Sequence, residues 1–227
     1  MICTKHDLEM SYFQMMRGKI LLKLYTYNVR LPVSQRIANW YHDIFSKFYD
    51  HFAPFEVPKY YEIIDMLVDE YITKDSKVLD ICCGTGNITF AAARKAKEVI
   101  GLDASNGMLS KARNKAQRKA LTNVRFIYGD VRERFNFTGG SFDIVTAGFS
   151  VPTNVPLFQG KNKNIVAEVY RILKSNGSLI LLEGLHEITD IYLSKEQYDD
   201  LLTETGFDDI EMKTINDLYG IVCAKKS

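Results

Sequence analysis

From about residue 60 onward, short apolar runs alternate with stretches whose apolar residues recur at helical spacing. The segment Tyr60–Tyr71 shows the helical spacing, and Val78–Ile81 is a short apolar run that leads into glycines. The same alternation predicts further strands at 99–103, 124–128, 142–147, 178–183, 209–215 and 220–224. It also predicts helices at 105–120, 164–174 and 194–205, with Ser105 and Ser194 as the N-caps of the first and last. Alternating strands and helices favour an α/β fold, a Rossmann-like doubly wound, mainly parallel sheet of seven strands.

The N-terminal region has a different pattern. Residues 8–31 predict a basic amphipathic helix, and residues 37–52 are rich in aromatic side chains. Two prolines, Pro54 and Pro58, then mark a joint. We therefore expect two parts: an N-terminal helical lid over 1–57, and an α/β domain over 58–227. The basic helix could pack on its own domain or contact a membrane surface, and the sequence leaves both open.

The composition of the chain limits which partners and which cellular location are expected. The chain has 29 Lys and Arg against 28 Asp and Glu, so its net charge of +1 predicts no affinity for nucleic acid. No run approaches about 18 apolar residues, so no transmembrane segment is predicted. There is no pattern of a secretory leader. The four cysteines form no Cys-x-x-Cys pair, which predicts neither a disulfide framework nor a metal site, and favours a cytoplasmic setting.

The most informative stretch is Val78–Asn87, in which a buried strand runs into Gly84 and Gly86 and then into a helix start. Glycines let the backbone approach a ligand, and the first helical N–H groups are free to face it. Asp103 closes the next strand about 20 residues later, where a carboxylate can bind ribose hydroxyls.

Two nucleotide ligands compete for such a turn. A dinucleotide turn needs a third glycine, which is missing here, and the carboxylate of Asp80 would repel a pyrophosphate. The same carboxylate suits a cationic ligand that carries an amino acid and an adenosine, which describes S-adenosylmethionine. A glycine turn that binds nothing is the remaining alternative.

At this point the sequence resembles a known family. Leu79–Asn87 is similar to the first motif of class I S-adenosylmethionine-dependent methyltransferases, and its Cys pair resembles the ubiquinone and menaquinone biosynthesis branch. Arg171–Leu179 and the Phe-x-x-x-Tyr-Asp stretch that ends at Asp50 are further matches. The resemblance implies that Asp130 accepts the adenine amino group and that Tyr49 lies over the cofactor. The cofactor contacts it implies are Asp80, Cys82, Cys83, Gly84, Thr85, Gly86, Asn87, Asp103, Ala104, Met108, Asp130, Val131 and Ala147.

The motifs specify the acceptor less well than the cofactor. Quinone-branch enzymes carry an Arg-Asn pair after the fourth strand and a long insertion after the fifth, and this chain has neither. We expect in-line methyl transfer to a small, largely apolar acceptor, with His186 or Glu183 as a candidate base and Tyr49 beside the reacting centre. The alternatives are a non-catalytic S-adenosylmethionine-binding regulatory module and a tRNA or rRNA methyltransferase. The second usually has an Asn/Asp-Pro-Pro-aromatic run, which Thr146–Phe149 is not. The basic cluster within 105–120 predicts a solvated helix face, and the oligomeric state is open.

Overall fold

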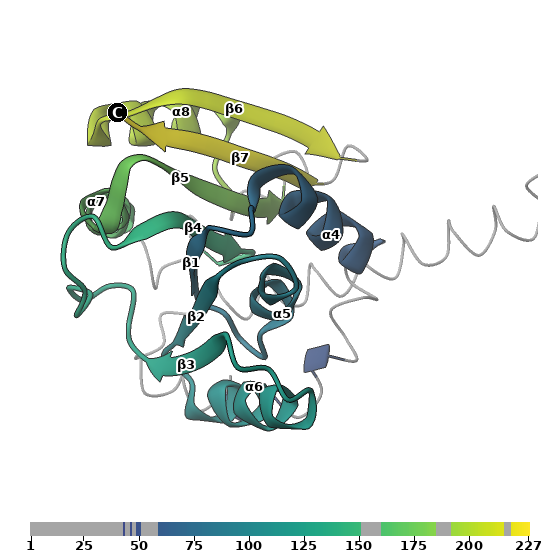
Figure 1. Ribbon diagram of the computed structural model, residues 1–227. Coiled ribbons are helices and arrows are strands. Elements are labelled where there is room, and N and C mark those ends of the chain that lie inside the picture. Colours follow the sequence, from purple (N-terminus) through teal and green to yellow (C-terminus); the bar gives the residue numbers. More distant parts are fainter. Residues whose placement is uncertain are drawn as a thin grey trace, which may run out of the picture.

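The computed structural model describes Asp43, Ser46, Tyr49, Asp50 and residues 59–150, 160–184, 192–215 and 219–227. Within this part, helices cover both faces of one central sheet (Figure 1). The helices are α4 (Tyr60–Tyr71), α5 (Asn87–Ala93), α6 (Asn106–Arg118), α7 (Asn162–Ile172) and α8 (Lys195–Thr205). The strands are β1 (Lys77–Ile81), β2 (Glu98–Asp103), β3 (Val124–Tyr128), β4 (Phe142–Gly148), β5 (Leu173–Gly184), β6 (Phe207–Ile215) and β7 (Tyr219–Lys226).

The seven strands follow the order β3-β2-β1-β4-β5-β7-β6. Strands β1 to β5 pair parallel with one another, whereas β7 pairs antiparallel with both β5 and β6. The chain order reverses between β1 and β4, and in open α/β sheets ligands bind at the carboxyl ends of the strands at such a switch point. The predicted doubly wound, mainly parallel sheet is confirmed.

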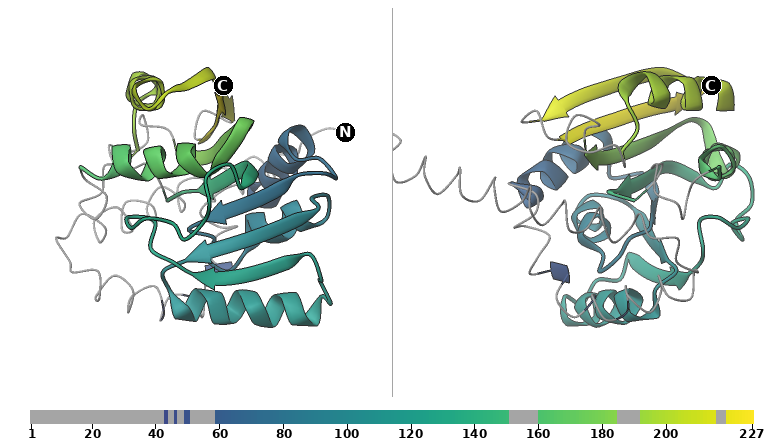
Figure 2. Two further views of the ribbon diagram at one scale, coloured as in Figure 1. Left: turned by 60° about the vertical axis from the view of Figure 1, so that its left-hand side comes forward. Right: turned by 180° about the vertical axis from the view of Figure 1, so that it is seen from behind.

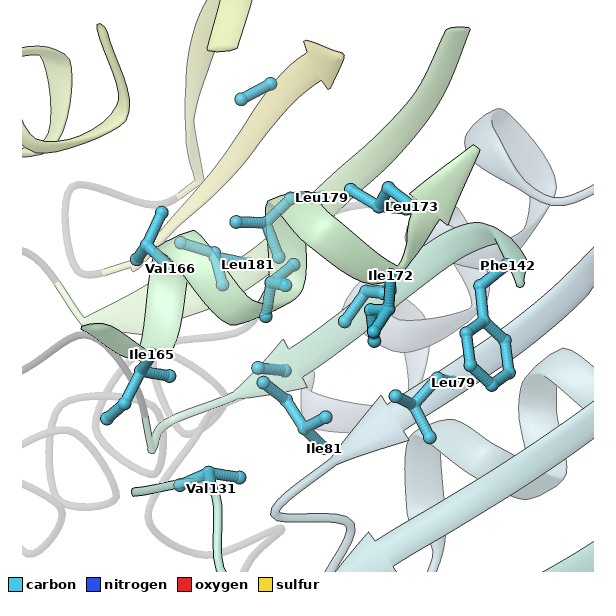
Figure 3. Packing of buried hydrophobic residues seen from close by; sticks show 14 of the residues in the cluster. Leu79, Ile81, Val131, Phe142, Ile165, Val166, Ile172, Leu173, Leu179 and Leu181 are labelled. Atoms are coloured by element: carbon cyan, nitrogen blue, oxygen red, sulfur yellow. The ribbon is translucent and has the colours of Figure 1, made fainter. Parts of the chain in front are cut away.

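Each face of the sheet has its own apolar core. Helices α4 and α5 pack on one face, where Ile63, Leu67 and Val78 are almost fully buried. Helix α7 packs on the opposite face against β4 and β5 through Ile165, Val166 and Ile172 (Figure 3), and α8 contributes Tyr198 and Leu202 to the same core. Helix α6 runs along β3 at the edge of the sheet (Figure 2). Parallel strands buried on both faces need continuous apolar sequences, which explains the short apolar runs.

The observed boundaries agree with most of the predicted elements. Ser194 caps α8 in a capping box with Gln197, as its position predicted. The predicted end of α7 at 174 and the predicted start of β5 at 178 were wrong, because the helix ends at Ile172 and β5 begins at Leu173. Leu173 is fully buried and pairs with Phe142 of β4, so burial in the sheet draws it into the strand.

The predicted helix at 8–31 and the joint at 53–58 lie outside the described residues. In the part of the chain that the structure describes, no helix is long and apolar enough to cross a membrane.

Candidate cofactor site

The glycine turn between β1 and α5 forms the centre of the site. Cys82, Gly84 and Gly86 all have positive φ angles, of 51°, 54° and 89°. A Cβ at Gly86 would lie 2.9 Å from Phe90 Cε2 and 3.1 Å from Phe126, so packing excludes a side chain there. At Gly84 the nearest atom to such a Cβ is Tyr49 Cε1, at 3.8 Å. Packing therefore restricts Gly86, whereas at Gly84 a Cβ would make only ordinary van der Waals contact and the positive φ is what favours glycine.

Asp103 lies beside this turn at the end of β2. Its carboxylate oxygens accept the N–H groups of Gly84 and Ser105, both at 2.8 Å. A carboxylate oxygen can accept more than one hydrogen bond, and carboxylates at this position of a doubly wound sheet bind ribose hydroxyls. The half-buried Asp103 therefore fits a ribose, and the turn beside it fits the rest of an adenosine-containing cofactor.

Asp80 lies below the turn and is almost completely buried, with 1% of its surface exposed. The hydroxyls of Thr89 and Thr146 donate hydrogen bonds to its two oxygens. Burial raises the pKa of Asp80 to about 7, because water no longer stabilises its charge. Asp80 thus connects the start of α5 to β4, and it lies behind the backbone that would face a ligand.

Asp130, expected to accept the adenine amino group, follows β3 and is held by Arg132. The Arg132 Nε and backbone N–H donate to Asp130 Oδ1 at 2.8 and 3.0 Å, and its terminal nitrogen contacts the other oxygen. Although burial by itself raises the pKa of Asp130, these hydrogen bonds and the guanidinium charge lower it below its usual range. Asp130 therefore stays a charged acceptor. Arg132 was not predicted from sequence, although an arginine two residues after a site carboxylate is a usable signal.

The other expected cofactor residues lie around the same strand ends. Ala104 and Asn87 are half-buried, and the side chains of Thr85, Met108, Val131 and Ala147 are buried. Cys82 is half-buried, and Cys83 packs with Leu109 and Phe126. Burial raises the pKa of both thiols well above the usual range, which disfavours thiolates. Among the described residues no cluster of His, Cys, Asp or Glu could hold a metal ion.

Aromatic side chains from four distant segments meet next to the turn. The side chains of Tyr49 and Asn87 lie near the Tyr60 hydroxyl, and burial raises the pKa of Tyr60 to about 12. The ring centroids of Tyr60 and Tyr219 lie 6.3 and 5.6 Å from that of Phe149. Phe149 directly follows β4 and has a φ of 53°, a strained conformation for a bulky residue. We call Tyr49, Tyr60, Phe149 and Tyr219 the aromatic group. The sequence named Tyr49 as a site residue, but nothing local in the sequence predicts that the other three rings pack together.

Glu183 and His186 are the two candidate bases. Glu183 is fully buried near the end of β5, and its charge adds to burial in raising the pKa of Tyr198 well above the usual range. His186 lies outside the described residues. The role of either residue as a base stays a prediction.

One surface prediction was wrong. Lys115 of α6 was expected on a solvated face, but only 19% of its side chain is exposed. Its ammonium group contacts Asp50 and lies 5.3 Å from the centre of the Phe90 ring. Asp50, which is distant in sequence, contacts this part of the helix, and local periodicity could not reveal that.

Comparison with known proteins identifies the domain. A family model described as a methyltransferase domain matches residues 72–212. The chain belongs to this methyltransferase-domain family. Its cofactor is accordingly S-adenosylmethionine, as the glycine turn and Asp103 predicted.

Curated relatives agree with the predicted branch of methyltransferases. A demethylmenaquinone methyltransferase from Lactococcus lactis is 36% identical over 118 residues, which covers 51% of this chain and 44% of that protein. One from Geobacillus sp. is 33% identical over 152 residues, covering 63% of this chain and 62% of the relative. The chain thus spans about half to three fifths of these relatives' length. An S-adenosylmethionine-dependent methyltransferase structure from Aquifex aeolicus has the same fold, with a TM-score of 0.67, 15% identity, and coverage of 80% of this chain and 98% of that one.

Proposed function

We propose that this protein transfers the methyl group of S-adenosylmethionine to a small, largely apolar acceptor by in-line displacement. The observation that carries the proposal is the position of the aromatic group directly beside the glycine turn, with Tyr49 nearest to Gly84. A site that combines a polar cofactor edge with aromatic walls suits an apolar acceptor.

Each residue then has a defined task. The cofactor supplies an electrophilic methyl group on a sulfonium. Asp103 holds the ribose hydroxyls and Asp130 the adenine amino group. The Tyr49 ring lies where it can stabilise the sulfonium charge, worth about 0.5–2 kcal/mol. The aromatic group excludes water and aligns the acceptor, and such positioning can contribute about 7–11 kcal/mol.

The N-terminal segment, residues 1–57, acts in this proposal as a lid over the domain formed by residues 58–227. The hydrogen bond from the Thr85 hydroxyl, within the glycine turn, to Asp50 supports this division, because it joins the segment to the cofactor edge. We place the reaction in the cytoplasm, with no nucleic acid partner. The helix predicted at 8–31 would cover the site or contact a membrane surface.

The names of the relatives indicate which acceptor to test first. They are demethylmenaquinone methyltransferases, so the ring of a reduced demethylmenaquinone is the reference acceptor. This chain lacks the Arg-Asn pair and the long insertion of that branch, so we propose a smaller acceptor without a long isoprenoid tail.

Transfer of a labelled methyl group tests the proposal. The protein is incubated with methyl-labelled S-adenosylmethionine and, separately, a short-tailed demethylmenaquinol, a tail-free hydroxynaphthalene and bulk tRNA. Label should appear in a small aromatic acceptor and not in RNA. Labelled RNA would contradict the proposal. Bound cofactor without transfer to any small acceptor would favour the regulatory module.

The candidate base has its own test, because a base is needed only if the acceptor loses a proton. If Glu183 takes that proton, Glu183→Gln lowers kcat at unchanged affinity for S-adenosylhomocysteine. Unchanged kcat in a folded variant leaves His186 as the candidate base.

A further inference from the structure

Two carboxylates from the N-terminal segment contact the cofactor domain on either side of Asp103. The first is Asp43, whose Oδ1 accepts the Ser105 hydroxyl at 2.6 Å and the Gly107 N–H at 2.8 Å. This places a negative charge at the start of α6, where the helix dipole favours it. The approach is close, since a Cβ at Gly107 would lie 2.8 Å from Asp43 Cα. Gly107 thus makes room for this contact.

The second carboxylate is Asp50. The Thr85 hydroxyl, within the glycine turn, donates to its Oδ1. The Lys115 ammonium contacts both Asp50 oxygens, at 3.0 and 3.1 Å, and the Asn87 side-chain oxygen at 3.4 Å. Only 19% of the Lys115 side chain is exposed, so water stabilises its charge less than that of a surface lysine. The charge of Lys115 therefore depends more on its pairing with Asp50.

Each of the two carboxylates hydrogen-bonds a residue that lies in or next to a segment whose backbone N–H donates to Asp103. Asp43 binds Ser105, whose own N–H donates to Asp103 Oδ1. Asp50 binds Thr85, whose neighbour Gly84 donates to Asp103 Oδ2. The two N-terminal contacts therefore hold the two backbone segments that orient Asp103.

We infer that Asp43, Asp50 and Lys115 are positioning residues that fasten the N-terminal segment to the glycine turn and α6, and that couple its docking to cofactor binding. Docking stabilises the arrangement in which Gly84 and Ser105 orient Asp103. Linkage makes the effect reciprocal, so bound cofactor also stabilises docking. The inference rests on the proposed lid, and it adds the residues that close it and the property that their removal changes.

Lys115→Gln and Asp43→Asn in the full chain test this inference, because each removes a charge with little change of volume. Lys119→Gln is the matched control, since Lys119 is an exposed lysine at the C-cap of the same helix. Lys115→Arg retains the pairing with Asp50 and serves as the conservative variant. The readouts are S-adenosylhomocysteine affinity by calorimetry and hydrogen exchange of the peptide that spans residues 43–50.

The two test variants should each weaken S-adenosylhomocysteine binding by about fivefold or more. They should also speed exchange in the 43–50 peptide, and S-adenosylhomocysteine should slow that exchange less than in the wild type. Lys119→Gln should have the affinity and the exchange rate of the wild type. Both quantities in Lys115→Arg should be closer to the wild-type values than those in Lys115→Gln.

Wild-type affinity and wild-type exchange in both test variants would overturn the inference. So would faster exchange throughout the core strands of Lys115→Gln, because that marks a structural role only. Neither readout depends on the acceptor. A wild type that binds cofactor and transfers nothing would therefore refute the proposed function and leave this result standing.

Discussion

At the scale of single residues, three carboxylates at neighbouring strand ends have three different environments. Asp80 is buried between two threonine hydroxyls, Asp103 accepts two backbone N–H groups, and Asp130 is paired with Arg132. These different environments give the three carboxylates different roles. Asp80 connects β4 to the start of α5, Asp103 is held by the Gly84 and Ser105 N–H groups, and Asp130 remains a charged acceptor.

Asp80 should make stability depend on pH. Its pKa rises from 3.8 to about 7 on folding, so its contribution to stability is complete below about pH 4 and is lost as pH rises toward 7. The loss has an upper bound of about 4 kcal/mol. The substituted side chain of the Asp80→Asn variant cannot ionise. In urea unfolding without cofactor, the free energy of unfolding of Asp80→Asn should therefore rise relative to that of the wild type between pH 4 and 8. A constant difference across that range would contradict the assigned pKa.

Asp103→Ala should weaken S-adenosylhomocysteine binding by about 2–4 kcal/mol, since two charge-assisted hydrogen bonds to the ribose are lost. Calorimetry measures the change, and Asp209→Ala, which removes an exposed carboxylate paired with Lys225, is the control. The fold should persist, because Asp103 is at a strand end. Unchanged affinity would mean that the ribose is held elsewhere.

At the scale of elements, the glycine turn depends on the packing of β2 and β3 behind it. The Phe126 ring of β3 fills the space above Gly101 of β2, where a Cβ would lie 2.6 Å from Phe126 Cδ1 and 2.9 Å from Cys83 Sγ. The same ring limits Gly86. Strand packing thus sets the shape of the turn.

Gly101→Ala should therefore destabilise the protein by about 1–3 kcal/mol through overpacking. Phe126→Leu in the same chain should recover part of that loss by vacating the space. The four proteins of this double-mutant cycle are compared by urea unfolding. Additive effects of the two substitutions would show that Phe126 is not the obstacle.

At the scale of the whole molecule, a seven-stranded domain presents one reactive edge and an N-terminal segment contacts it. Deleting residues 1–57 should leave a folded domain, because α4 already covers its face of the sheet. The truncated protein should bind S-adenosylhomocysteine less tightly and transfer no methyl group, as judged by calorimetry and labelled transfer. A membrane anchor would instead preserve transfer to soluble acceptors and lose only liposome binding. A truncated protein that does not fold would make the segment part of the core.

The sequence predicted local features well and distant contacts poorly. Strand ends, the Ser105 and Ser194 caps and the glycine turn follow from short-range patterns, and all three are present. The meeting of Tyr60, Phe149 and Tyr219, and the burial of Lys115 under Asp50, depend on segments far apart in the chain. Periodicity contains no information about such contacts, so these parts of the site became visible only in three dimensions.

The most direct test of the central claim is calorimetric titration of the full chain with S-adenosylhomocysteine and, separately, with NAD. The turn lacks the third glycine of a dinucleotide site, and Asp80 lies beneath it. The account predicts saturable binding of S-adenosylhomocysteine, with NAD binding far more weakly. Tight NAD binding without any S-adenosylhomocysteine binding would contradict it.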